Sequence, residues 1–381
     1  MKEDWKECKL GDVVEINQNS FSEKENWMFV NYLDTGSITE NKISEIQYIN
    51  LIDEKLPSRA KRKVKKNSII YSTVRPNQKH FGIIKSFPEN FLVSTGFAVL
   101  DVNKKIAFPD FVYYYLIQNE NTESLHAIAE QTTSAYPAIK PSDIADISII
   151  LPPLATQQKI AKILSSLDDK IELNNKINDN LEQQAQAIFK SWFVDFEPFG
   201  GKMPKGWKMG KLSDLITVKY GKDHKKLEDG SYPVYGSGGI MRYVDKFLYD
   251  KESVLIPRKG TLNNVFYINE PFWSVDTMFY TEMTKENLAK FVYFFVKGKD
   301  LNSMNAGSAV PSMTTEILNA IEVVIPSDEY LEKFENIVSP MFKQIKQCII
   351  ENENLASIRD TLLPKLMSGE IEVDEVDEVK V

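Results

Sequence analysis

The sequence predicts an α+β protein made of two similar mixed α/β regions, each followed by one long helix. Three observations predict this fold: an internal repeat, a 4-3 spacing of apolar residues late in each repeat, and aromatic-rich and β-branched segments early in each. A length of 381 residues exceeds what one hydrophobic core usually supports. With 43% hydrophobic and 26% charged residues the chain has the composition of a folded protein.

The repeat has a constant offset of 174 residues over its second part. The segment Ser134–Ile139 (SAYPAI) recurs as Ser308–Met313 (SAVPSM), and the offset then holds without a gap through the following helices. Upstream the match is looser. Ile69–Tyr71 leading to Arg75 corresponds to Val254–Ile256 leading to Arg258. The varying offsets there predict loops of different length on a shared framework.

The long helices are predicted from apolar residues that alternate at steps of four and three, which is the pattern of a coiled-coil seam. About 40 residues at 1.5 Å per residue span roughly 60 Å, far more than an average globular helix. Asn178 and Asn352 occupy equivalent seam positions, and buried Asn penalises wrong registers. Pro340 predicts a kink or an effective helix start. The predicted seam residues are Ile160, Leu164, Leu167, Ile171, Asn178, Leu181, Val338, Met341, Ile345, Asn352 and Leu355.

These elements divide the chain into five segments. Strands are expected at Ser68–Val74, Phe91–Leu100, Glu252–Ile256 and Phe272–Tyr280, and short helices near Asp110–Gln118 and Glu286–Val296. Asp195–Gly201 is expected to be a linker. The predicted segments are a first globular region (1–153), a long helix (154–194), the linker with a second globular region (195–326), a second long helix (327–369) and an acidic tail (370–381).

Charge is distributed unevenly along the chain. The net charge of −8 comes largely from the tail, where six acidic residues oppose Lys380. Lys55–Lys85 holds ten Lys and Arg and no acid, and Lys202–Lys226 holds eight Lys against two Asp. Because binding uses local patches, two such runs in matching halves favour contact with nucleic acid.

Several classes of protein are disfavoured. The N-terminus lacks the apolar core of a signal peptide and no apolar run approaches the roughly 20 residues of a membrane span, so a cytoplasmic protein is expected. Cys8 and Cys348 are far apart, and only three histidines occur, so neither a disulfide framework nor a metal site is expected. A glycine loop for S-adenosylmethionine and an Asn-Pro-Pro-Tyr type motif are both missing, which argues against a self-contained methyltransferase.

Together these residues resemble the specificity subunit of type I restriction-modification systems, over nearly the whole chain. The characteristic strings are LPPL at Leu151–Leu154, QQKI at Gln157–Ile160, SSLDDKI at Ser165–Ile171, FKSWF at Phe189–Phe193, MPKGWK at Met203–Lys208 and LLPKLMSGEI at Leu362–Ile371. Their order in the chain, more than any single string, carries the resemblance.

The resemblance implies two target recognition domains in a pseudo-twofold repeat, separated by two long helices that form an antiparallel coiled coil. Each domain would recognise one half of a bipartite site in double-stranded DNA, and the helices would set the spacing between the halves. It also implies two methyltransferase subunits and the restriction and translocase subunits as partners. Methyl transfer, with S-adenosylmethionine as cofactor, and cleavage would belong to those partners, so the chain itself would have no catalytic centre and no cofactor.

Candidate DNA-binding residues are those with forked or multiple donors for base edges, and Lys and hydroxyl residues for phosphates. They gather in two loops and a basic run in the first half, and in three loops and a basic run in the second. In the first half they are Arg59, Lys61, Arg62, Lys63, Arg75, Asn77, Gln78, Lys79, His80, Thr132, Thr133, Ser134 and Tyr136. In the second half they are Lys222, Lys225, Tyr235, Ser237, Arg258, Lys259, Thr261, Asn263, Asn264, Asn305 and Ser308.

One alternative stays open on the residues alone. A coiled-coil adaptor or scaffold protein without sequence-specific DNA binding would also contain the two seams. It would not require basic residues in matching loops.

Overall fold

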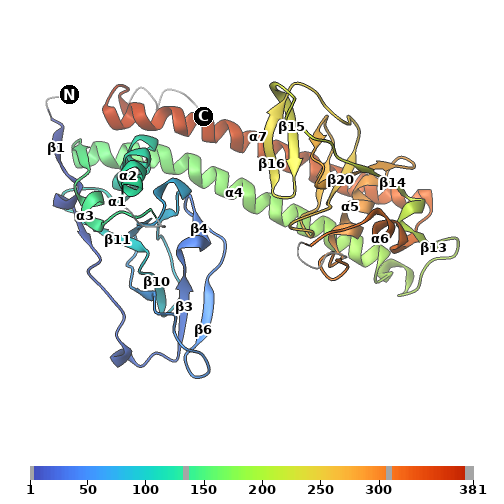
Figure 1. The fold of residues 1–381 in the computed structure, drawn as a ribbon, viewed down its shortest axis with the longest axis horizontal. Coiled ribbons are helices and arrows are strands. Elements are labelled where there is room, and N and C mark those ends of the chain that lie inside the picture. The colour runs from blue at the N-terminus through green and yellow to red at the C-terminus, as the bar shows by residue number, and fades with distance from the viewer. Residues whose placement is uncertain (1–3, 132–136, 306–310, 374–381) are drawn as a thin grey trace. The chain divides into compact units, whose positions relative to one another are not determined.

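The computed structural model describes residues 4–131, 137–305 and 311–373 and divides into two compact units. Unit 1 comprises residues 1–173 and 350–381, and unit 2 comprises residues 174–349. The two long helices, α4 (Leu154–Phe193) and α7 (Asp328–Ser368), each contribute one half to each unit (Figure 1). The compact units therefore do not follow the linear order of the five predicted segments.

Unit 1 contains two four-stranded sheets, two two-stranded ribbons (β1 with β12, and β4 with β5) and three short helices besides the halves of α4 and α7. One sheet has the order β2-β11-β8-β9 and is antiparallel, and the other has the order β6-β3-β10-β7 with β3 and β10 parallel. The strands are β1 (Lys6–Lys9), β2 (Val14–Ile16), β3 (Phe29–Leu33), β4 (Ile38–Thr39), β5 (Lys42–Ile43), β6 (Gln47–Asn50), β7 (Ala60–Arg62), β8 (Ile69–Ser72), β9 (Phe81–Ile83), β10 (Phe91–Ser94), β11 (Phe97–Val102) and β12 (Ser148–Leu151). The helices are α1 (Pro109–Leu116), α2 (Asn119–Glu130) and α3 (Pro141–Ala145).

The core of unit 1 joins its antiparallel sheet to the helix ends. Leu100 and Phe111 lie in one buried cluster with Leu164 of α4 and Leu366 of α7. Gln157, in the first turn of α4, is 1% exposed, and its amide is satisfied from both sides: Oε1 accepts from Phe108 N at 2.8 Å and Nε2 donates to Pro152 O at 2.9 Å. A buried polar side chain with its hydrogen bonds made fixes where α4 begins.

Unit 2 repeats this plan with different lengths. Its sheets have the orders β14-β20-β17-β18 and β16-β15-β19, with a ribbon of β13 and β21. The elements are β13 (Lys208–Lys211), β14 (Ile216–Tyr220), β15 (Asp229–Gly236), β16 (Gly239–Val244), β17 (Ser253–Pro257), β18 (Phe266–Ile268), β19 (Trp273–Ser274), β20 (Met278–Met283), β21 (Glu322–Ile325), α5 (Ala289–Lys297) and α6 (Thr315–Ala320). Its core gathers Phe189 and Phe193 of α4, Phe291 and Phe294 of α5 and Phe334 of α7.

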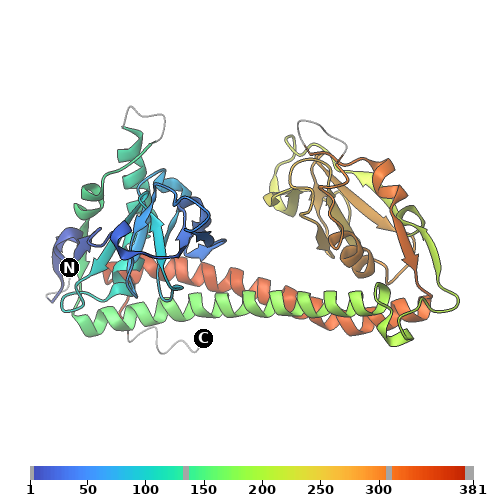
Figure 2. The same cartoon turned by 90° about the horizontal axis from the view of Figure 1, so that it is seen from below.

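Within each unit the two long helices pack antiparallel (Figure 2). In unit 1 Asp168 pairs with Arg359 and Lys170 with Glu351, so the chain numbers of the partners run in opposite directions. In unit 2 the ring of Phe189 contacts that of Phe334, and Trp192 contacts Tyr330. The predicted fold class, two mixed α/β regions with two long antiparallel helices, is confirmed.

Local details differ from the sequence-based expectations in three places. The single strand expected over Phe272–Tyr280 is two strands, β19 and β20, which lie in different sheets. α7 runs through Pro340 without a new start, so the expected helix start there is wrong. The single strand expected over Phe91–Leu100 is two strands, β10 and β11, which turn at Thr95 and Gly96 and enter different sheets. A turn of two residues inside an apolar run leaves little trace in the pattern of hydrophobicity.

Cys8 and Cys348 are free thiols. No helix in the part of the chain that the structure describes is both long and apolar enough to cross a membrane. Across residues 4–131, 137–305 and 311–373, no three His, Cys, Asp or Glu side chains gather in a way that could hold a metal ion.

Candidate nucleic-acid interface

The first candidate loop of unit 1 is a tight turn shortly after β8. Its 3-10 turn η4 (Pro76–Gln78) lies between Arg75 and Lys79, whose φ angles are positive, 48° and 54°. Positive φ is costly for residues other than glycine and persists only where the surroundings hold it. The main-chain N of Arg75 donates to Pro137 O at 2.9 Å, and α2 packs against the turn. These contacts hold the turn beside the segment that follows residues 132–136.

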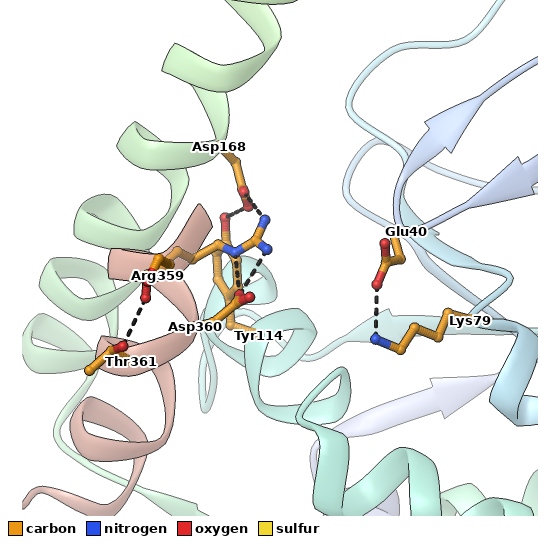
Figure 3. Close-up of polar contacts among 8 residues, drawn as sticks. Glu40, Lys79, Tyr114, Asp168, Arg359, Asp360 and Thr361 are labelled. Carbon is orange, nitrogen blue, oxygen red and sulfur yellow. Dashed lines mark hydrogen bonds and ion pairs between the residues drawn. The ribbon is translucent and has the colours of Figure 1, made fainter. Parts of the chain in front are cut away.

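The side chains of this turn are not equally available. Asn77 and Gln78 are exposed. Lys79 Nζ pairs with Glu40 Oε1 at 3.0 Å (Figure 3). The Nδ1 atom of His80 lies 2.5 Å from the carbonyl O of Ile38. Asn77 and Gln78 are therefore the two side chains of the turn that can form new hydrogen bonds at no cost to existing ones.

Unit 2 contains the same turn, held by the same pairing. In unit 1 Ile139 N donates to Thr73 O and Arg75 N to Pro137 O. In unit 2 Met313 N donates to Arg258 O at 2.9 Å and Gly260 N to Pro311 O at 3.3 Å. The isolated bridges match as well, Val74 with Ala138 and Lys259 with Ser312.

This match corrects the correspondence expected between Arg75 and Arg258. The hydrogen bonds make Arg75 equivalent to Gly260, and Thr73 equivalent to Arg258. Gly260 also has a positive φ angle, of 88°, so both units turn the chain in the same way at this position. The sequence-based alignment of Arg75 with Arg258 is therefore wrong by two residues.

The basic run of unit 1 separates into paired and unpaired cations. Lys63 pairs with Glu25 and lies 4.9 Å from the ring centroid of Trp27, and Lys65 pairs with Asp101 at 2.9 Å. Arg59 and Lys61 are exposed and, like Lys66, form no ion pair among the described residues.

Arg62 differs from its neighbours because it is half-buried without a carboxylate. Its Nε atom is buried and has no hydrogen-bond partner in the described part of the chain, and burial lowers the pKa of its guanidinium. A desolvated guanidinium gains most from an anion such as a phosphate. Arg59, Lys61 and Arg62, at strand β7, therefore form a cationic surface that is available to an anion.

In unit 2 the asparagines of the predicted loops hold the loops themselves. Asn264 Nδ2 donates to Ser237 O at 2.7 Å, Asn263 Nδ2 to Asp300 Oδ1 at 3.3 Å, and Asn305 Oδ1 accepts from Ser312 N at 2.7 Å. Asn263 and Asn305 are exposed despite these bonds, as are the candidates Lys222, Lys225, Lys259 and Thr261.

Two further candidates of unit 2 lie away from open solvent. Arg258 is half-buried, donates from Nη1 to Asp276 O at 3.1 Å and lies over the ring of Tyr220. Tyr235 is 8% exposed and packs its ring against Phe272. Its side chain belongs to the core of the sheet rather than to the surface.

Five candidate residues lie outside the described residues: Thr132, Thr133, Ser134, Tyr136 and Ser308. The segments that flank them are the ones paired with the two equivalent turns.

Sequence reasoning missed a hollow in unit 2 beside the predicted loops. Its volume is about 420 Å³, and His224, Met241, Asp276 and Thr277 line it together with the turn at Ser237. The base-reading groups predicted from the sequence are hydrogen-bond donors, so an aspartate carried no signal there.

The predicted seam residues lie on the packed faces of the long helices. Asn174, one further position of the same seam, is 1% exposed. Of the predicted set, Ile160, Leu164, Leu167, Val338 and Leu355 are buried, and Ile171, Asn178, Leu181, Met341, Ile345 and Asn352 are half-buried.

In unit 1 the two helices and α1 also share a polar contact. Tyr114 Oη donates to Asp168 Oδ2 at 2.6 Å, and Arg359 Nη1 donates to Asp168 Oδ1 at 2.6 Å (Figure 3). Burial raises the pKa of the Tyr114 hydroxyl, and the charge of Asp168 raises it further. Burial alone lowers the pKa of Arg359, but its bonds to Asp168 and Asp360 more than reverse this. The triad joins three elements through one carboxylate.

Comparison with known proteins assigns the fold and the two turns to a family. The model of the type I restriction modification DNA specificity domain matches the chain twice, over residues 2–183 and 204–359. The chain belongs to this family. Both equivalent turns and both helix segments lie within the matched ranges, apart from the last residues of each helix.

Curated relatives span nearly the whole chain. The HindI specificity subunit of Haemophilus influenzae is 29% identical, covering 97% of this chain and all of the relative. The MjaIX specificity subunit of Methanocaldococcus jannaschii is 25% identical, covering 98% and 95%. Among solved structures, the type I restriction-modification S subunit from M. genitalium has the same fold, with a TM-score of 0.57, 19% identity and 96% coverage of both chains.

Proposed function

We propose that this chain of the specificity-domain family is the DNA-specificity subunit of a type I restriction-modification complex. Each unit recognises one half of a bipartite site in double-stranded DNA. The observation that carries the proposal is the turn that both units hold with the same main-chain hydrogen bonds, Thr73–Arg75 and Arg258–Gly260. The same turn occurs in a loop of each unit, with amide and cationic side chains around it. This favours two equivalent DNA-recognising units over a coiled-coil adaptor that does not bind DNA.

The partners follow from this role. Two methyltransferase subunits dock on the long helices, whose exposed faces carry large apolar residues such as Leu173, Ile337, Ile350 and Ile358. Methyl transfer, with S-adenosylmethionine bound by the methyltransferase subunits, and cleavage by the restriction subunits take place outside this chain, which contributes recognition and no catalytic group. The α4 and α7 helices set the number of unspecified base pairs between the half-sites.

The decisive experiment is to co-express the chain with the methyltransferase subunit encoded beside it and to map adenine methylation across a plasmid of varied sequence. Methylation confined to one motif of two defined halves and a fixed gap supports the proposal. Methylation that is absent, or that falls at no split motif, contradicts it and favours the adaptor.

The phosphate-binding role of the β7 surface has a test of its own. Binding that releases counterions weakens as salt rises. The logarithm of the binding constant falls against the logarithm of the salt concentration with a slope of about −0.9 per phosphate contact. In the assembled complex, Arg59→Gln with Lys61→Gln is expected to reduce this slope by about two. Lys104→Gln is the matched control, because Lys104 is an exposed lysine that follows the C-terminal end of β11 and is not part of the β7 surface. Equal slopes for the double variant and the wild type contradict the assignment.

A further inference from the structure

The hollow of unit 2 lies within the surface proposed to face DNA. Lys259 N and Arg258 N both donate to Thr277 O, and Arg258 Nη1 donates to Asp276 O. On the other side, Asn264 Nδ2 donates to Ser237 O. The turn that carries Arg258 and the exposed Lys259 therefore also builds the wall of the hollow, so a DNA duplex bound at Lys259 lies beside the opening.

The walls are fixed by main-chain hydrogen bonds between separate elements. Val275 N donates to Tyr235 O at 3.0 Å, and Lys222 N donates to Ser274 O at 2.8 Å. A Cβ atom on Gly236 would lie 2.6 Å from Sδ of Met241, so this glycine is what lets Met241 cover the turn. A hollow whose walls are held by the backbone can discriminate between bases without rearranging.

The polar groups of the hollow suit a base edge rather than a phosphate. Asp276 is exposed and forms no ion pair among the described residues. Arg258 bonds the main-chain O of Asp276 and not its carboxylate. A carboxylate repels a phosphate but accepts hydrogen bonds from the exocyclic amino groups of cytosine and adenine.

The remaining walls complete such a site. The Nδ1 atom of His224 is shielded from solvent and has no hydrogen-bond partner within the described ranges. Met241 and Val275 add apolar surface. A buried polar atom without a partner is costly, so a ligand that bonds to it relieves that cost.

Unit 1 shows that the fold does not require an acid at this place. Thr73 N donates to Gly96 O as Arg258 N does to Thr277 O, so Thr95 and Gly96 are the counterparts of Asp276 and Thr277. There the methyl of Thr35 lies 2.7 Å from where a Cβ of Gly96 would be. The aspartate is specific to unit 2, because unit 1 has Thr95 at the equivalent position.

We infer that Asp276 is a specificity-determining residue that selects a base carrying an exocyclic amino group, cytosine or adenine, at one position of the second half-site. The inference rests on the proposed function. The hollow receives the major-groove edge of that base, and the carboxylate accepts its amino hydrogen.

The test uses the assembled complex with Asp276→Asn and methylation mapped over plasmid libraries. Discrimination at one base pair of the second half-site is expected to fall by about 10- to 100-fold, because a single good base contact contributes roughly 1–3 kcal/mol. The first half-site and the gap are expected to stay unchanged. Glu286→Gln is the matched control, since this exposed carboxylate lies beyond the far end of β20.

An unchanged motif in Asp276→Asn overturns the inference. If the variant methylates nothing, Asp276→Ala is compared with the wild type on duplexes that vary each base pair of the second half-site. Weakening confined to one base pair then supports the inference, and uniform weakening overturns it. A wild-type complex that methylates no split motif overturns the proposed function first, and this inference with it.

Discussion

The two units make the same contact between a short helix and the long helices with opposite chemistry. Phe111–Tyr113 of α1 recurs as Phe291–Tyr293 of α5, so Tyr114 corresponds to Phe294. The offset of 174 pairs Asp168 with Phe342 and Arg359 with Ala185. In unit 1 these positions form the hydrogen-bonded triad. In unit 2 Phe294 contacts Phe342 with ring centroids 5.8 Å apart, and Ala185 is fully buried in the same cluster.

The contrast extends to the first turn of each long helix. Gln157 of unit 1 and Leu331 of unit 2 are equivalent and each is 1% exposed. The glutamine needs its hydrogen bonds to Phe108 and Pro152, whereas the leucine needs only to be covered. The same backbone arrangement therefore accepts either a polar or an apolar side chain at this buried position.

The difference shows which unit determines that α4 packs against α7. A buried charged contact adds little net stability, but it disfavours partners that leave a charge unpaired. Position 185 of α4, equivalent to Arg359, is alanine, so a second copy of α4 offers no partner for Asp168. The triad therefore favours pairing of α4 with α7, while the aromatic cluster of unit 2 supplies stability without that selectivity.

The largest effect is expected in the aromatic cluster. Phe294→Ala removes a ring that is 1% exposed, and the cavity is expected to cost about 3–5 kcal/mol of the free energy of unfolding of unit 2. Hydrogen exchange of peptides from α5 and β17 measures the loss of protection. Phe295→Ala, at a half-buried neighbour, is the control, and an equal loss for both variants would refute the assignment.

A smaller effect is expected from Arg359→Met, which leaves the Asp168 carboxylate with only the hydroxyl of Tyr114. Because both charged side chains are about one-third exposed, the cost is expected to be about 1–3 kcal/mol rather than that of a fully buried pair. Exchange in α1 and in the last turns of α7 provides the measurement. Asp360→Asn, which removes the more exposed partner of Arg359, should cost less; the reverse order would contradict the triad.

Tyr114→Phe removes one hydrogen bond and leaves the packing of the ring intact. We expect a loss of about 1.5 kcal/mol, the lower end of what a hydrogen bond to a charged group contributes. The same exchange measurement checks it, with Tyr48→Phe as the control because the ring of Tyr48 is 64% exposed. A loss above that of Arg359→Met would mean that the hydroxyl, and not the cation, holds the carboxylate.

The smallest effect is expected when the triad of unit 1 is replaced by the apolar residues that make the same contact in unit 2. Tyr114→Phe, Asp168→Phe and Arg359→Ala together give unit 1 the residues of unit 2. Replacing a buried ionic group by apolar residues of suitable volume is often neutral, so the triple variant is expected to lie within about 1 kcal/mol of the wild type. Protection in α1 below that of Arg359→Met alone would show that the two units are not interchangeable at this contact.

Sequence alone determined the features that depend on local periodicity and on repetition. Helix α4 spans Leu154–Phe193, where a helix over 154–194 was predicted. The agreement is close because the apolar periodicity extends over the whole length of the helix. The repeat also predicted two units of one fold and the loops on which their turns lie. The strand run at Phe91–Leu100 shows the limit, since a turn of two residues inside it sends its halves to different sheets.

Only the tertiary structure decided which residues meet across the chain. The hydrogen bonds of Arg75 with Pro137, and of Gly260 with Pro311, show that Arg75 is equivalent to Gly260. The alignment from the sequence was wrong there by two residues. Lys63 and Lys65 were indistinguishable from Arg59 and Lys61 until Glu25 and Asp101 were found beside them. Asp276 carried no sequence signal, because a lone carboxylate gains meaning only from the hollow around it. These contacts join residues far apart in sequence, and no local spacing encodes them.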